Sequence, residues 1–176
     1  RLKKIFFFIL LFFIILSTNL YSQNISVVNI QYLIDSNPNY NEILKKIEQS
    51  QDKHLEKFKK KEIELKKLLD DIENSKLILN ENEIKLQIDN YNTLLTDYTN
   101  HIEEFNTHYQ NQIIIIRENI LKEIIVLLEE YAIENSIELV FDSTTYLIAS
   151  NSLDITNIIN NKLIQKNLDL EYKDFE

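Results

Sequence analysis

The sequence predicts an α+β protein: a long antiparallel α-helical coiled-coil hairpin that projects from a small β-barrel-like base formed by oligomerisation. Two observations support this prediction. Apolar residues between positions 84 and 109 alternate at spacings of four and three, which forms one continuous seam only on a helix packed along a partner helix. Short β-branched segments before and after the hairpin predict strands. The seam residues are Ile84, Ile88, Tyr91, Leu95, Tyr98, Ile102, Phe105 and Tyr109.

Residues 1–22 have the pattern of a secretory signal peptide. Arg1, Lys3 and Lys4 form a basic start, residues 5–16 are an uncharged apolar run, and Ser22 offers a small residue at the cleavage site before Gln23. The apolar run is shorter than the ~20 residues that cross a bilayer. We therefore expect a cleaved leader rather than a retained anchor, and an exported mature chain.

The composition excludes several kinds of catalytic site. The chain has 0 glycine residues, so the glycine-rich phosphate loops, the dinucleotide-binding turn and the strained nucleophile elbow are all missing. It has 0 cysteine residues, which excludes thiol nucleophiles, thiolate metal clusters and disulfides. The sequence therefore favours a protein that is not an enzyme and that uses no cofactor.

Charge is distributed unevenly along the chain. The leader holds three of the 19 basic residues and none of the 28 acidic ones, so the mature chain carries 16 − 28 = −12, which argues against nucleic acid as a partner. Lys45–Lys67 nevertheless holds nine lysines against five acidic residues. This stretch is either a solvated helix face with i,i+4 ion pairs or a basic flank that attracts acidic or unfolded partners.

The first half of the mature chain is predicted to contain a strand, a helical turn and a long helix. Residues 24–30 are short and β-branched, residues 31–35 form a helical turn, and Pro38 starts a helix that runs to about Leu77. A hairpin turn is expected near 74–82, where Asn80 and Glu83 form a capping-box pattern. The helix keeps a weaker heptad set, with polar interruptions at Gln51, His54 and Lys61: Leu44, Ile47, Phe58, Leu65, Leu68 and Ile72.

The second half changes from helix to strands and back to helix. Apolar residues of 113–128 occupy most of the helix circumference, which predicts burial on several sides. A break at Asn135-Ser136 precedes predicted strands at 137–141 and 146–149, joined by a turn at 142–145. Asp154 is expected to cap a closing helix. The inward residues of that helix are predicted to be Ile155, Ile158, Ile159 and Leu163.

These elements divide the mature chain into four parts. They are a first base strand and turn (23–37), the hairpin arm (38–112), the remainder of the base (113–167) and a C-terminal tail (168–176). Three short strands with open edges form no secure sheet alone, so the base is predicted to assemble from several subunits. The residues predicted to form the oligomeric base are Val27, Ile30, Ile120, Ile124, Leu127, Val140, Tyr146 and Ile148.

The histidines are the main candidates for chemistry. His101, Glu104 and His108 lie at i, i+3 and i+7 along one predicted helix, but metal sites in helical bundles need several such pairs facing inward. No metal site is therefore expected. His54 is interpreted as a tolerated polar interruption of the seam rather than a catalytic base.

Two segments carry a family resemblance: VVNIQYLIDSNP at Val27–Pro38 and ELVFDSTTYLIASNSLDIT at Glu138–Thr156, separated by the long charged hairpin. In this order and spacing they resemble the OmpH/Skp family of periplasmic chaperones. The resemblance implies a homotrimer with a β-barrel base and three helical arms, and a periplasmic holdase that binds unfolded outer-membrane proteins without ATP. It also implies indirect proximity to the membrane. The acidity of this chain departs from basic relatives, so an interaction with lipopolysaccharide is not carried over.

Two functions remain open at this point. The first is an ATP-independent periplasmic holdase, and the second is a structural or adaptor hairpin of an envelope or export assembly. An aromatic stripe on the arm is explained by hairpin packing, by contact with clients, or by both. Its residues are Tyr91, Tyr98, Phe105 and Tyr109. The residues predicted to bind clients are Lys53, Lys57, Lys59, Lys60, Lys61, Tyr91, Tyr98 and Phe105.

Overall fold

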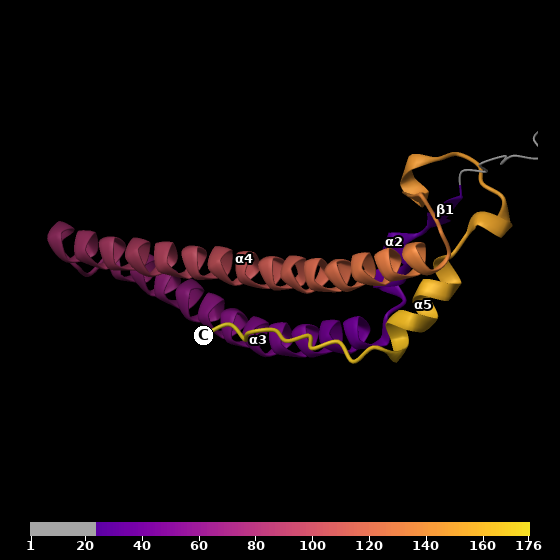
Figure 1. The fold of residues 1–176 in the computed structure, drawn as a ribbon. Helices are drawn as coiled ribbons and strands as arrows, with labels where there is room; N and C mark the ends of the chain where they lie inside the picture. The colour runs from indigo at the N-terminus through magenta and orange to yellow at the C-terminus, as the bar shows by residue number, and fades with distance from the viewer. Residues whose placement is uncertain (1–23) are drawn as a thin grey trace, which may run out of the picture.

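The computed structural model describes residues 24–176 and forms a long helical hairpin joined at one end to a small base (Figure 1). The predicted signal peptide lies outside the described residues. The hairpin consists of α3 (Pro38–Ser75) and α4 (Glu81–Glu134). The base contains β1 (Ile25–Val28), α2 (Ile30–Asp35), β2 (Leu139–Asp142), the 3-10 helices η1 (Ser143–Thr145) and η2 (Asn151–Leu153), and α5 (Thr156–Gln165).

The base is built around a parallel pair of strands. Ile25 lies opposite Leu139, and the register continues to Val28 opposite Asp142. Parallel strands need a crossover connection, and here the whole helical hairpin supplies it. On the other side of β1, the Ile155 N–H donates to the Val27 carbonyl oxygen at 3.0 Å. Within residues 24–176, β1 is therefore flanked on both sides, whereas β2 pairs only with β1.

The prediction of a strand at residues 146–149 is wrong. The segment lies between η1 and η2 without strand structure, and the side chains of Leu147 and Ile148 are 100% and 92% exposed. A strand needs a partner for its backbone N–H and C=O groups. The edge of β1 that could have served already holds Asp154 in a bridge to Val27. An apolar run alone could not reveal that this edge is occupied.

Short polar caps set the path of the chain from the base into the arm. The Asn29 side chain accepts the Tyr32 N–H at the start of α2. The Asn37 side chain accepts the N–H groups of Asn39 and Tyr40 at the start of α3, with Pro38 in the first turn. Asn37 is itself buried, so its cap satisfies backbone donors that water cannot reach. The predicted helical turn and the predicted start of the first helix are both confirmed.

The hairpin turn is capped as the sequence predicts. The Glu83 N–H donates to Asn80 Oδ1 at 3.1 Å, and the Asn80 N–H donates to Glu83 Oε2 at 3.1 Å, which completes a reciprocal capping box. With 54 residues, α4 is about 80 Å long at ~1.5 Å per residue. Because α4 extends further towards the base than α3 does, the last turns of α4 pack on the base rather than on α3 (Figure 1).

The seam of the arm follows the predicted heptads closely near the base and less closely near the tip. Phe105 and Tyr109 are buried, and on α3 the buried positions include Ile47, Phe58 and Ile72. Two predicted seam residues of α4, Ile88 and Leu95, are exposed instead. At the second of these sites the neighbouring Leu94 is the more buried residue, because the packing face drifts on a straight 3.6-residue helix.

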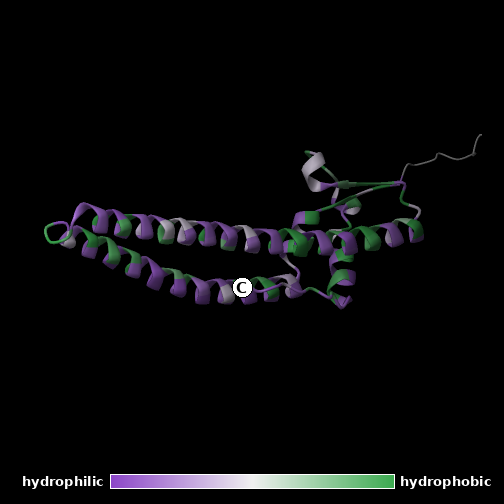
Figure 2. Cartoon of the chain, turned by 90° about the vertical axis from the view of Figure 1, so that its left-hand side faces the viewer, coloured by the Kyte–Doolittle hydropathy of each residue, from purple (hydrophilic) through white to green (hydrophobic). Residues whose placement is uncertain are grey.

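The root of α4 forms the centre of the core through one stripe of its surface. The stripe packs against α2, α3 and α5, and Figure 2 shows hydrophobic residues gathering at this end of the arm. The single chain leaves Ile114, Ile115, Ile125 and Val126 exposed, so burial on several sides, which is expected of an assembly, stays a prediction. The buried stripe consists of Ile116, Ile120, Ile124 and Leu127.

The closing helix α5 differs in two details from the prediction. Ile155, Ile159 and Leu163 are buried, but Ile158 is 42% exposed. The helix starts one residue later than expected, so Ile155 occupies the cap position while Asp154 Oδ1 accepts the Thr156 N–H at 2.8 Å. None of the helices between residues 24 and 176 combines the length and apolarity needed to cross a membrane.

Candidate binding surface of the helical arm

Aromatic rings line the arm where α3 and α4 lie side by side. Phe58 of α3 meets Tyr98 at 6.3 Å and Phe105 at 5.1 Å between ring centroids, and Phe105 meets Tyr109 at 5.1 Å. All three contacts are edge-to-face, the geometry that aromatic pairs prefer. Tyr98, Phe105 and Tyr109 of the predicted aromatic stripe therefore pack within the hairpin, and contact of these rings with clients stays a prediction.

An apolar pocket of about 400 Å³ opens on this stripe. Burial raises the pKa of Tyr98, and nearby Glu62 raises it further, so the phenol at the pocket keeps its proton. Lys57 and Lys61 contribute flexible cationic side chains beside the ring of Phe58. The lining residues are Lys57, Phe58, Lys61, Leu94, Asp97, Tyr98 and His101.

The structure brings only some of the predicted client-binding residues together. Lys57, Lys61 and Tyr98 line the pocket, and Phe105 is buried next to Phe58. The remaining predicted residues do not line it: Lys53, Lys59, Lys60 and Tyr91. All five of the predicted lysines are exposed. Their role in binding stays a prediction.

Residues 167–176, which we call the strap, lie along the arm (Figure 1). Leu168 is buried, and Leu170, Tyr172 and Phe175 pack against the hydrophobic core. The Tyr172 hydroxyl donates to the Lys46 carbonyl oxygen at 3.3 Å. The sequence predicted only a tail at 168–176, yet the apolar residues at every second position from 168 to 172 were the signal of an extended, half-buried segment.

The Asp174 carboxylate binds a pair of buried hydroxyl groups on the arm. It accepts hydrogen bonds from Ser50 and from the Tyr109 hydroxyl, the latter at 2.6 Å, while His54 Nε2 lies 3.7 Å away. The Ser50 and then the Tyr109 hydrogen bonds lower the pKa of Asp174 to about 2. Burial raises the pKa of Tyr109, and its bond to Asp174 raises it further. Tyr109 therefore keeps the proton that it donates.

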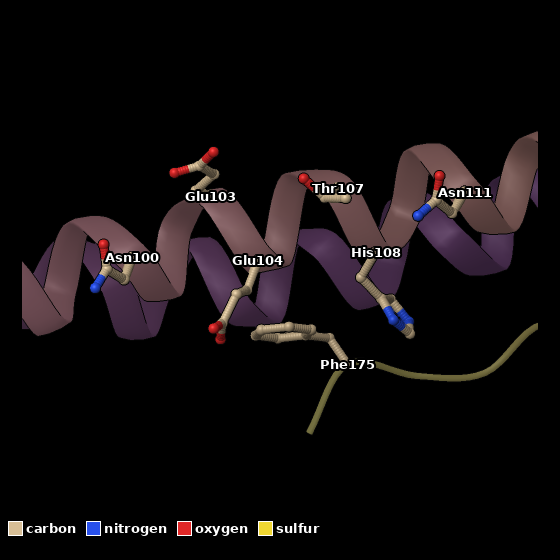
Figure 3. Close-up of a pocket in the computed structure, with 7 residues that line it drawn as sticks. All are labelled: Asn100, Glu103, Glu104, Thr107, His108, Asn111 and Phe175. Carbon is tan, nitrogen blue, oxygen red and sulfur yellow. The ribbon is translucent and has the colours of Figure 1, made fainter.

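The ring of Phe175 lies among the three histidines and Phe105. Its centroid is 5.0 Å from His101, 5.6 Å from His54 and 5.6 Å from His108. Figure 3 shows the ring of Phe175 beside the side chains of Glu104 and His108, where the three residues help to line a surface pocket. Sequence reasoning missed this contact, because a histidine at the edge of a seam does not reveal what covers it.

The histidine–glutamate pattern on α4 is used for packing contacts in this structure. His101 Nδ1 lies 3.8 Å from the Glu104 carboxylate, and His108 Nε2 lies 2.7 Å from the Lys173 carbonyl oxygen. Over residues 24–176, no three His, Cys, Asp or Glu side chains gather in a way that could hold a metal ion.

The predicted base residues fall into two groups. Val27, Ile120, Ile124 and Leu127 are buried within the chain itself, whereas Ile30, Val140 and Tyr146 are half-buried. Ile148 is exposed in the segment between η1 and η2. The first group therefore builds the core of one chain, and a contact with another subunit has to come from other residues.

Two polar clusters fix the joint between the arm and the base. Arg117 donates to Asp35 at 3.1 Å and to the Tyr40 hydroxyl at 3.1 Å, and the Tyr40 bond is the largest cause that raises the pKa of Arg117. Burial alone would raise the pKa of Asp142, but hydrogen bonds from Thr144, the Ile30 N–H and Ser143 outweigh it and lower the pKa. The root of α4 and the start of α2 are thus held in place by charged groups.

A family model described as outer membrane protein (OmpH-like) matches residues 24–163. The chain belongs to the OmpH-like family. The OmpH-like match covers the base and both helices of the arm and stops at residue 163, so the strap lies beyond it.

Comparison with solved structures supports the same fold. The chain is similar to a crystal structure from Caulobacter crescentus CB15 described as a candidate outer membrane chaperone (OmpH-like), with a TM-score of 0.69. The alignment covers 90% of this chain and 94% of the other, at 8% sequence identity. At this identity the similarity shows the OmpH-like fold alone. No curated protein matches the chain.

Proposed function

We propose that this protein is an ATP-independent periplasmic holdase chaperone that encloses unfolded outer-membrane proteins between helical arms and prevents their aggregation. The observation that carries the proposal is the OmpH-like arm itself, in which a narrow buried seam leaves long exposed flanks and an open apolar pocket. A holdase needs many weak contacts with varied chains. Lysine side chains beside aromatic rings can supply such contacts without fixing one client geometry.

We propose that the functional unit is a homotrimer, as the family resemblance implies. Exposed apolar residues on the root of α4 and the edge of β2 that no strand of residues 24–176 covers support self-association, since both would be covered in a shared base. The contact surface is drawn from residues that the single chain leaves exposed. They are Ile114, Ile115, Ile125, Val126, Leu139 and Phe141.

The alternative is an adaptor hairpin of an envelope or export assembly. Two neighbouring apolar residues at the hairpin turn favour it, because Leu77 and Ile78 are 95% and 84% exposed. An adaptor would bind one folded partner through this tip. A holdase would instead bind many unfolded chains along the arm.

The experiment is an aggregation assay with a shortened arm. A urea-unfolded outer-membrane β-barrel protein is diluted into buffer without ATP, and light scattering is followed with and without the mature chain. The short-arm variant lacks residues 59–72 and 84–97, two heptads from each helix, and keeps the capped turn at 73–83. Wild type should suppress scattering, and the short-arm variant should fold but suppress it far less.

The double substitution Leu77→Ser and Ile78→Ser is the matched control for the adaptor reading. It removes the apolar tip and leaves the flanks of the arm intact, so a holdase should keep its activity. Full protection by the short-arm variant, or a requirement for ATP, would overturn the holdase proposal. The mass of the wild-type assembly in solution reports separately on the trimer.

A further inference from the structure

The strap covers a site that is built to receive a carboxylate. Ser50 and Tyr109 are 5% and 1% exposed, and their hydroxyl oxygens lie 2.7 Å apart at the seam of the arm. Buried hydroxyl groups in such a place need a hydrogen-bond partner. Asp174 supplies it, although its own side chain remains 63% exposed. The recognising groups are therefore fixed in the arm, while the recognised carboxylate comes from an extended segment at its surface.

The strap is held partly through its backbone. The Lys173 N–H donates to Gln112 Oε1 at 2.9 Å, the Lys173 carbonyl oxygen pairs with His108, and the Phe175 N–H donates to the Tyr109 hydroxyl at 3.4 Å. Backbone recognition of an extended segment tolerates many sequences, and side-chain pockets then add preference. The preference visible here is for a carboxylate followed by an aromatic ring.

The surface continues beyond the end of the strap. His101 and Phe105 contact the ring of Phe175, and His101 also lines the apolar pocket of about 400 Å³ with Phe58. No strap residue lines that pocket. A longer peptide could therefore follow the strap's course and extend onto the side chains of Phe58 and Tyr98.

The strap and the lysine-rich stretch of α3 carry opposite net charges. The strap has four carboxylate side chains and one lysine, whereas Lys45–Lys67 of α3 holds nine lysines against five acidic residues. The side-chain pattern of the strap is alternately apolar and polar from Leu168 to Tyr172. This alternation is also the pattern of a transmembrane β-strand in an outer-membrane barrel.

We propose that the arm surface formed by Ser50, His54, Phe105, His108 and Tyr109 is a binding site for extended acidic peptide segments in which a carboxylate precedes an aromatic residue, and that the strap is its displaceable internal occupant. The proposal rests on the holdase function and names the segments that the arm recognises. The strap then acts as a built-in competitor, which a client segment replaces. Because the strap is tethered, it competes at a high effective concentration and keeps the site closed to weak ligands.

The test is a binding titration with a defined probe. The probe is a fluorescent synthetic peptide with the sequence of residues 167–176, and a second peptide carries serine in place of its phenylalanine. The proteins are the mature wild-type chain and a released variant, Asp174→Asn with Phe175→Ser. Glu171→Gln is the control, since it removes a strap carboxylate other than the one bound by Ser50 and Tyr109.

The released variant should bind the probe at least about tenfold more tightly than wild type, because a site that is occupied ~90% of the time raises the apparent Kd about tenfold. Glu171→Gln should bind like wild type. Adding Ser50→Ala and Tyr109→Phe to the released variant should weaken binding about tenfold, the effect of losing hydrogen bonds to a carboxylate. The serine peptide should also bind more weakly.

Several results would overturn the proposal. Equal binding by wild type and the released variant would mean that the strap does not occupy the site. Absence of binding to the released variant would mean that the surface is no peptide site, and binding insensitive to Ser50→Ala and Tyr109→Phe would place it elsewhere. If the released variant forms a smaller assembly than wild type, the strap binds a second copy of the chain rather than its own arm, and the proposal fails.

The aggregation assay separates this proposal from the proposed function. If peptide exchange occurs as expected but wild type suppresses no aggregation, the peptide site stands and the holdase function fails. If wild type suppresses aggregation but the released variant binds no probe, the holdase function stands and the peptide site fails. When both hold, the released variant should suppress aggregation at a lower molar ratio than wild type.

Discussion

The Tyr109 hydroxyl donates a hydrogen bond to the Asp174 carboxylate at 2.6 Å, across 65 residues of sequence. One partner is buried in the seam of the arm and the other belongs to a segment at its surface. The bond therefore couples the internal packing of the hairpin to the docking of the strap. It is one of several hydrogen bonds that the strap makes to the arm.

The first prediction concerns the energy of this bond. Tyr109→Phe keeps the ring in place but removes the hydroxyl, so the Asp174 carboxylate loses a donor and the Phe175 N–H loses an acceptor. We expect the free energy of unfolding to fall by about 1–2 kcal/mol. Asp174→Asn should lower the free energy of unfolding by less, since the Asp174 side chain is largely exposed. Urea denaturation at one fixed protein concentration measures both changes.

The double variant tests whether the two residues act together. Its loss of stability should be smaller than the sum of the single losses by about 0.5–1 kcal/mol. Strict additivity would show that the bond contributes nothing to folding.

The second prediction concerns acid. The pKa of Asp174 is lowered from the ordinary 3.8 to about 2, so the carboxylate stabilises the docked strap at pH above about 4. That contribution should decline as the pH falls from about 4 and be lost below about 2. Phe175→Trp reports docking by fluorescence, because the chain has 0 tryptophan residues of its own.

The control for this titration is the double variant Asp174→Asn with Phe175→Trp, which lacks the titrating carboxyl group. The groups that face Asp174 are Ser50 and His54 from α3 and Tyr109 from α4, and they are present in both proteins. Circular dichroism follows global unfolding in parallel. Identical emission curves in the two backgrounds would show that protonation of Asp174 does not release the strap.

The helical arm could be predicted almost completely from the sequence because its signals are local. Heptad spacing, Pro38 in the first turn of α3 and the reciprocal cap of Asn80 and Glu83 all lie within a few residues of what they determine. The shift from Leu95 to Leu94 shows the limit of this reasoning, since the seam position depends on how two helices drift against each other.

The base and the strap could not be predicted in the same way, because long-range pairing decides both. Asp154 occupies the edge of β1, and this leaves residues 146–149 without a partner. The strap was visible as an alternating apolar pattern, but nothing local to it points to Ser50 or Tyr109. Lys57 and Lys61 of α3 lie one turn apart, but their meeting with Tyr98 of α4 at one pocket depends on how the two helices pack.

The third prediction separates the core of one chain from a contact between chains. Ile124 is buried within the chain, so Ile124→Ala should lower the free energy of unfolding by about 2–4 kcal/mol. The neighbouring Ile125 is 44% exposed, so Ile125→Ala should have a much smaller effect on the fold of each chain. It should instead weaken self-association, which sedimentation measures. An assembly unaffected by Ile125→Ala and Val126→Ala together would remove this face from the proposed trimer contact.

The fourth prediction concerns the mobility of the arm. Few side chains are buried near the hairpin turn, where Ile72 is the outermost buried residue of α3, while the root of α4 buries Ile116, Ile120 and Ile124. Amide hydrogen exchange should therefore be fast around Asn80 and slowest between 116 and 127. Uniform protection along both helices would contradict this gradient and would point to an arm stabilised by contacts outside the single chain.

The last prediction tests four lysines of α3, of which Lys57 and Lys61 line the pocket. Lys57, Lys59, Lys60 and Lys61 are exposed, and Lys61 Nζ lies 3.4 Å from the Glu64 carboxylate. Changing all four to glutamine should alter the free energy of unfolding by no more than about 1 kcal/mol, because exposed ion pairs contribute little. Association with an unfolded client that carries acidic segments should become slower and less dependent on salt.

A matched variant decides whether position or total charge matters. Changing Lys66, Lys67, Lys76 and Lys85 to glutamine removes the same charge from the outer part of the arm, beyond the pocket. If the pocket guides capture, stopped-flow association should slow more in the first variant than in the second. Equal slowing of association in both variants would show that the lysines act only through the overall electrostatic field of the arm. If neither variant slows association, these lysines play no part in client capture.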